Sequence, residues 1–167
     1  QRMKNRFVTT TVAAGLLALG GGTVAHADAV ERGAYLARIM DCAGCHMPRA
    51  ADGAPIVEAG LSGGSVGFEI PGLGIFWAPN LTPADSGLGP WSDAQIAAAL
   101  LTGLRPDGRT LAPAMPWPAY AALTDGDVTA LVAYLRSLAP VDAPRVGPAG
   151  SAEAARAPFY RVTLPED

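Results

Sequence analysis

The chain has 167 residues, which suffices for one compact domain and is short for two. Half of its residues are hydrophobic but only 7% are aromatic, so a core built from side chains alone would be thin. The 12 basic and 15 acidic residues give a net charge of −3, which argues against nucleic acid and anionic membranes as partners.

The N-terminus has the three parts of a secretory signal peptide. A basic leader precedes an apolar stretch over residues 7–24, and the small residues of Ala25-His26-Ala27 follow it. This pattern predicts cleavage before Asp28. The alternative is an uncleaved membrane anchor, although threonines and glycines dilute an apolar run that is near the lower limit for a bilayer. We therefore expect residues 1–27 to direct export, with membrane association only if they are retained.

Cleavage would make the protein more acidic. It removes Arg2, Lys4 and Arg6 and no acidic residue, so the net charge of −3 becomes −6 and no lysine remains. Exported proteins commonly carry disulfides, yet this chain has only two cysteines, at C-x-x-C spacing. The pair therefore needs a chemical explanation of its own.

The first element predicted after the leader is a helix over residues 29–42, which contains no proline. Residues 47–90 are rich in glycine and proline and have no helical period. Within them, residues 67–79 hold at most a short hairpin. This part of the chain is expected to form ordered loops.

The remaining helices are predicted by their capping residues. Ser92, with a glutamine three residues on, is typical of a capping box that opens a helix to about Leu101. Residues 118–123 are expected to form one or two helical turns, and Thr124 caps the last helix. The clearest amphipathic stripe follows in that helix: Val128, Leu131, Val132 and Leu135.

From Pro140 onward the chain is rich in proline and alanine and is expected to be an extended tail. No internal repeat is found. The sequence thus predicts a mostly α domain over residues 28–139, with three or four short helices and long ordered loops, followed by a tail over residues 140–167.

The segment Cys42-Ala43-Gly44-Cys45-His46 admits three chemical interpretations. A zinc site needs about four protein ligands, or three and a water, and adjacent Cys45 and His46 would strain a tetrahedral arrangement. A thioredoxin-like dithiol requires a βαβ context, and no strand is predicted before the motif. The third interpretation is covalent attachment of haem c.

Haem c fits the spacing best. Cys42 and Cys45 would each form a thioether bond with one vinyl group, and His46 would lie under the iron as its proximal ligand. Export agrees with this interpretation because haem c is attached outside the cytoplasm. The porphyrin would also supply the apolar core that the side chains lack. The sequence therefore predicts one haem c.

The second axial ligand is predicted by elimination. His26 and Met3 belong to the leader, and the chain has no other histidine besides His46. Met40 and Met47 are tethered beside the motif on the proximal side. Met115, in a proline-flanked segment, is the remaining methionine that could reach the distal face. Ligation by His and Met leaves no open coordination position, which disfavours peroxidase or gas-binding chemistry.

Together these features resemble a class I cytochrome c, and more narrowly the cytochrome c subunits that accept electrons from bacterial periplasmic dehydrogenases of alcohols, aldehydes and sugar acids. The resemblance spans most of residues 30–138. The stretches that carry it are residues 32–46 (RGAYLARIMDCAGCH), 79–83 (PNLTP), 89–96 (GPWSDAQI), 103–120 (GLRPDGRTLAPAMPWPAY) and 123–138 (LTDGDVTALVAYLRSL).

The resemblance implies an all-α class I cytochrome c fold and several roles for residues. The helix containing Gly33 should cross the C-terminal helix, and Pro79 and Asn80 should lie near the haem edge. Arg105 is a candidate for neutralising a haem propionate, with a solvated turn residue as the alternative. Trp117 is expected to pack against the haem. The multihaem relatives continue into further C-x-x-C-H domains, whereas one haem is expected here.

The leading hypothesis is periplasmic electron transfer by an electron carrier and not an enzyme. A dehydrogenase would donate the electron, and a terminal oxidase or another cytochrome of the respiratory chain would accept it. The tail either wraps a catalytic partner or folds back on its own domain. The alternative function is a haem-based redox enzyme that acts on a small sulfur or nitrogen compound, which would require Met115 to leave the iron.

Overall fold

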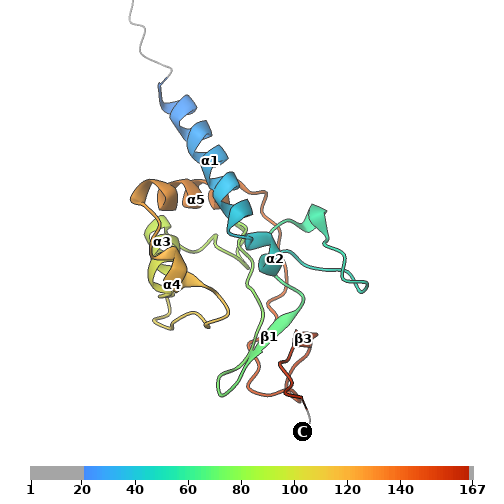
Figure 1. Cartoon of the computed structure of the whole chain (residues 1–167). Coiled ribbons are helices and arrows are strands. Elements are labelled where there is room, and N and C mark those ends of the chain that lie inside the picture. Colours follow the sequence, from blue (N-terminus) through green and yellow to red (C-terminus); the bar gives the residue numbers. More distant parts are fainter. Residues whose placement is uncertain (1–20, 166–167) are drawn as a thin grey trace, which may run out of the picture.

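The computed structural model describes residues 21–165, as Figure 1 shows. Residues 1–20 of the predicted leader lie outside this part, and residues 21–27 form the first turns of the first helix. The elements follow in chain order: α1 Gly21–Ile39, α2 Cys42–His46, η1 Val57–Ala59, β1 Gly67–Ile70, β2 Gly74–Phe76, α3 Asp93–Thr102, α4 Trp117–Tyr120, α5 Asp125–Ser137 and β3 Phe159–Tyr160. No helix within residues 21–165 is long and apolar enough to span a bilayer.

The crossing of α1 and α5 is the main helix contact of the fold (Figure 1). The two helices meet at Gly33, where a Cβ atom would overlap the carbonyl oxygen of Ala130 and crowd Cβ of Tyr134. The close approach therefore depends on the missing side chain. On α5, the predicted apolar stripe is buried throughout: Val128, Leu131, Val132 and Leu135. The predicted crossing is confirmed.

Helix α1 ends three residues earlier than the sequence predicts. Asp41 has a φ of 53° and lies in the left-handed region, which interrupts the helix between Ile39 and Cys42. Aspartate tolerates this conformation better than most residues because its short side chain forms local hydrogen bonds. The break turns the chain, so that α2 is a separate short helix carrying the C-x-x-C-H motif.

The predicted N-terminal caps of α3 and α5 are confirmed. Ser92 and Gln95 form a reciprocal capping box, and Gly103 ends α3 at a φ of 71°. Thr124 accepts a hydrogen bond from the backbone N–H of Asp127 and caps α5. Two clusters of buried side chains lie between these helices, α1 and the loops, and Cys42 packs against both of them. The motif is thus anchored at the centre of the core.

The predicted hairpin within residues 67–79 is present, but it belongs to a three-stranded sheet in the order β2-β1-β3. Strands β1 and β2 pair antiparallel, and β3 from the tail pairs parallel with β1. The domain is therefore mostly helical with a few short strands. The tail lies against its own domain, since Ala149 also bridges to Ile75 and the Trp77 indole donates to the Pro158 carbonyl at 3.0 Å.

Candidate haem-binding site

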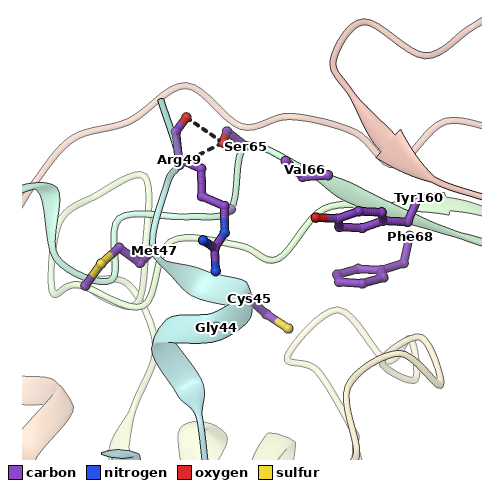
Figure 2. Close-up of a pocket in the computed structure, with 9 residues that line it drawn as sticks. Gly44, Cys45, Met47, Arg49, Ser65, Val66, Phe68 and Tyr160 are labelled. Carbon is purple, nitrogen blue, oxygen red and sulfur yellow. Dashed lines mark hydrogen bonds between the residues drawn. The ribbon is translucent and has the colours of Figure 1, made fainter. Parts of the chain in front are cut away.

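The two thiols lie on one short helix. Cys42 and Cys45 are one turn apart on α2, both are half-buried, and neither forms a disulfide. Figure 2 shows the Cys45 thiol pointing away from the Met47 side chain. Gly44 lies against the Asp41 carboxylate, where a Cβ would overlap it. Two thiols on one face of a helix can bond to two points at the edge of one group.

Burial keeps both thiols protonated. It raises the pKa of Cys42 to about 11, and it also raises the pKa of Cys45 above its ordinary value. A redox-active C-x-x-C pair has the opposite property, because its attacking thiol has a lowered pKa. The thioredoxin-like interpretation is therefore disfavoured. Within residues 21–165, no three His, Cys, Asp or Glu side chains gather in a way that could hold a metal ion.

His46 is fixed by one hydrogen bond. Its side chain is 5% exposed, and its Nδ1 lies 2.7 Å from the carbonyl oxygen of Pro79. A carbonyl oxygen only accepts, so Nδ1 carries the proton and Nε2 keeps its lone pair. Burial lowers the pKa of His46, an effect that the Pro79 bond partly opposes. A neutral imidazole with a free Nε2 is the form that binds iron.

A glycine segment closes over the end of α2. The Gly63 N–H donates to the His46 carbonyl at 2.9 Å, and the Gly64 N–H donates to the Ala78 carbonyl at 2.9 Å. A Cβ on Gly64 would overlap the carbonyl oxygen of Cys45. This segment therefore ties α2 to the segment that carries Pro79.

Met115 is half-buried and lies on the loop that leads into α4. Its backbone N–H donates to Ala112, and its carbonyl accepts from Trp117 at 2.8 Å. Helix α4 in turn reaches the motif, because the Tyr120 hydroxyl donates to the carbonyl of Met40 at 3.3 Å. The Met115 loop is thus attached to an element that contacts the chain two residues before Cys42.

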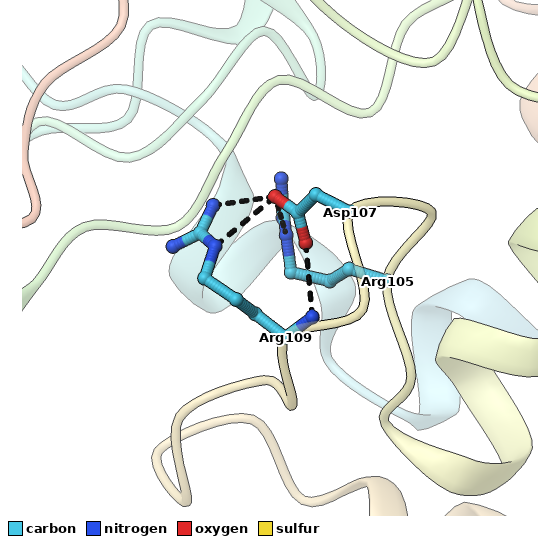
Figure 3. A network of polar contacts seen from close by, with 3 residues as sticks. All are labelled: Arg105, Asp107 and Arg109. Atoms are coloured by element: carbon cyan, nitrogen blue, oxygen red, sulfur yellow. Dashed lines mark hydrogen bonds and ion pairs between the residues drawn. The ribbon is translucent and has the colours of Figure 1, made fainter.

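Arg105 belongs to a charged cluster on the same loop, shown in Figure 3. Its guanidinium lies 5.2 Å from the centre of the Trp91 ring and 3.4 Å from the Asp107 carboxylate. Arg109 binds the same carboxylate at 2.6 Å, and this hydrogen bond is the main reason that the pKa of Asp107 falls to about 2. Two guanidinium groups therefore share one carboxylate.

Trp117 and Asn80 have clear contacts of their own. The Trp117 indole packs on Gly103, where a Cβ would come within 2.7 Å of the ring. The Asn80 side chain donates to the Val141 carbonyl at 2.7 Å and accepts from the N–H and hydroxyl of Thr82, both at 2.8 Å. Sequence reasoning missed Thr82 and Val141. The Asn-x-Thr spacing is typical of an Asx turn and could have predicted the hydrogen bond between Asn80 and Thr82. No local pattern predicts the contact with Val141.

Sequence comparisons relate the chain to known proteins. The family model for cytochrome c matches residues 30–139. The chain is 40% identical over 122 residues to the fructose dehydrogenase cytochrome subunit of Gluconobacter japonicus, covering 72% of this chain and 24% of that protein. It is 36% identical over 152 residues to the alcohol dehydrogenase (quinone) cytochrome c subunit of Gluconacetobacter polyoxogenes, covering 85% and 30%. It is 38% identical over 114 residues to the gluconate 2-dehydrogenase cytochrome c subunit of Pantoea cypripedii, covering 67% and 24%.

The chain belongs to the cytochrome c family. Its one cytochrome c domain with a single cysteine pair implies one haem c, and a domain of this kind is an electron carrier. The chain spans 24% to 30% of the length of these three relatives.

Proposed function

We propose that this protein carries single electrons in the bacterial periplasm through one haem c bound to Cys42 and Cys45, with His46 and Met115 as the axial ligands of the iron. The donor is a periplasmic dehydrogenase, and the acceptor is a terminal oxidase or another cytochrome of the respiratory chain. The bound haem supplies one-electron chemistry between Fe(III) and Fe(II).

The observation that carries the proposal is the environment of His46. The imidazole directly follows the cysteine pair, is almost fully buried, and donates from Nδ1 to Pro79 at 2.7 Å. This bond orients the ring and leaves Nε2 as the atom that faces a metal. The tautomer and the charge of the side chain are therefore those that a proximal ligand needs.

The other residues complete the work of the protein. Cys42 and Cys45 hold the edge of the porphyrin to the core, and Met115 closes the distal position, so that small molecules do not reach the iron. A thioether ligand raises the reduction potential relative to a second histidine. We also propose that Arg105 and Trp117, which lie on either side of Met115 in the chain, line the propionate side and the apolar wall of the haem pocket.

The names of the relatives support a dehydrogenase as the electron donor. They are cytochrome subunits of fructose, alcohol and gluconate dehydrogenases, so we propose that this chain serves an oxidoreductase of a similar kind. With the leader removed, the surface is acidic and lacks lysine, and the docking surface of a partner is expected to be basic. Membrane contact is expected only if the leader is retained.

Haem attachment is tested by expressing the protein in a haem c maturation strain and extracting it with acidified acetone. We expect the wild-type chain to keep its haem, with the mass of one haem added. A variant carrying Cys42→Ala and Cys45→Ala should release all its haem into the organic phase, and each single variant should keep one thioether bond. Haem extracted from the wild type, or more than one haem per chain, contradicts the proposal.

Electron transfer is separated from haem enzyme chemistry by carbon monoxide binding to the reduced protein at neutral pH. A closed His46/Met115 site should not bind carbon monoxide, because no coordination position is open. Rapid binding by the wild-type protein would contradict a pure electron carrier and favour a haem-based enzyme.

A further inference from the structure

The segment that accepts the His46 hydrogen bond is held on its other side by the C-terminal tail. Pro79 accepts from His46 at 2.7 Å, and the next residue, Asn80, donates from Nδ2 to the carbonyl of Val141 at 2.7 Å. Val141 lies beyond residue 139, where the match to the cytochrome c family ends. The contact is therefore made by a part of the chain outside the family domain.

The buried hydroxyl of Thr82 adds a second connection between this segment and the tail. The Thr82 hydroxyl donates to Oδ1 of Asn80 at 2.8 Å and accepts from the N–H of Val141 at 3.2 Å. Asn80 is 6% exposed and Thr82 is 1% exposed. Hydrogen bonds at such low exposure are strong, and losing one partner leaves a buried polar group unsatisfied. The link is thus rigid and costly to break.

Further contacts hold the same segment at both ends. The Ser86 hydroxyl accepts from Asn80 and from the N–H of Ala143, both at 3.1 Å, and donates to the Asp142 carboxylate at 3.0 Å. At the other end, the Trp77 indole donates to the tail at Pro158. The tail therefore holds residues 77–86 at both ends, and this segment contains the Pro79 carbonyl that accepts the hydrogen bond from His46.

We infer that Asn80 and Thr82 are positioning residues for the proximal histidine, and that residues 141–158 of the tail act with them as a strap. The strap fixes the Pro79 carbonyl in front of Nδ1 of His46. A stronger bond at Nδ1 makes the imidazole a stronger electron donor, which favours Fe(III) and lowers the reduction potential. The inference rests on the proposed ligation of the iron by His46.

The test compares Thr82→Val with Thr82→Ser in the full-length haem protein. Valine keeps the shape of the side chain and removes the hydroxyl, whereas serine keeps the hydroxyl. Thr82→Val should shift the Fe(III)/Fe(II) equilibrium toward Fe(II) by up to about tenfold, or about 59 mV for one electron. The His46 Nδ1 proton should exchange faster with solvent in nitrogen-edited NMR. Thr82→Ser should restore both values to within about twofold of the wild type.

Arg161→Gln is the matched control. It removes the ion pair between the far end of the tail and Glu69, on the exposed surface, without touching residues 77–86. Both the potential and the proton exchange should stay at their wild-type values. Asn80→Ala should change the potential and the proton exchange in the same direction as Thr82→Val. If Asn80→Ala does not fold and bind haem, the comparison of Thr82→Val with Thr82→Ser tests the inference.

Two results would contradict these proposals. A folded Thr82→Val protein with an unchanged potential and unchanged exchange of the His46 proton would overturn the inference alone. A wild-type protein whose low-spin spectrum lacks a histidine ligand would contradict the proposed function, and the inference with it.

Discussion

His46 and Asp107 both have a lowered pKa, but for different physical reasons and with opposite effects on their charge. Burial lowers the pKa of His46, so the ring stays neutral, while the Arg109 guanidinium lowers the pKa of Asp107, so the carboxyl stays charged. The C-x-x-C-H spacing predicted the first of these residues as a ligand. The family resemblance led us to expect Pro79 near the haem edge. Its hydrogen bond with His46 was not predicted, because no local pattern joins residues 46 and 79.

The charge cluster gives a test at the residue scale. Asp107 has a pKa of about 2 against an ordinary value of 3.8, so its contribution to stability is present above pH 3.8 and is lost as the pH falls through 2. Arg109→Gln removes the main hydrogen bond and should raise the pKa of Asp107 toward its ordinary value. Carbon-detected NMR titration of the carboxyl measures this. Arg161→Gln, whose partner is Glu69, is the control, and an unchanged value near 2 in Arg109→Gln would show that the arginine is not the cause.

At the scale of elements, capping residues and hydrophobic periodicity in the sequence predicted the helices α3 and α5. The capping box of α3, the Thr124 cap of α5 and the stripe of α5 are local patterns, and all were confirmed. The break at Asp41 was not predicted, because neither Gly nor Pro marks it. Asp41 adopts the left-handed conformation there, and its carboxylate packs against Gly44.

The helix crossing is tested by Gly33→Ala. Alanine is the better helix former, yet its Cβ would overlap the Ala130 carbonyl and force α1 away from α5. We expect a loss of about 1–3 kcal/mol in the free energy of unfolding, as is usual for overpacking. Denaturant unfolding followed by circular dichroism measures the change.

Gly126→Ala is the matched control on α5. Its Cβ would meet only the Thr124 hydroxyl, at 3.9 Å, so the variant should gain up to about 0.5 kcal/mol from helix propensity in the first turn of α5. An equal gain in Gly33→Ala would show that the crossing does not need the glycine.

At the scale of the whole molecule, long-range pairing limits prediction from sequence. Strand β3 has two residues and pairs with β1, which lies far away in the chain, so no periodicity reveals it. The docking of the tail at Val141 is likewise a contact between distant segments. The haem c motif, by contrast, lies within five residues and is chemically specific, so it was predictable. Met115 was predicted by elimination and stays a prediction.

In the proposed electron carrier, His46 and Met115 occupy both axial positions of the haem iron. The most direct measurement is the weak far-red absorption band that marks thioether ligation of ferric haem, recorded at neutral pH for the wild type, Met115→Ala and Met47→Ala. We predict the band in the wild type and in Met47→Ala, and its loss in Met115→Ala because the thioether is removed. A wild type without the band, or a Met115→Ala protein that keeps it, would contradict the account.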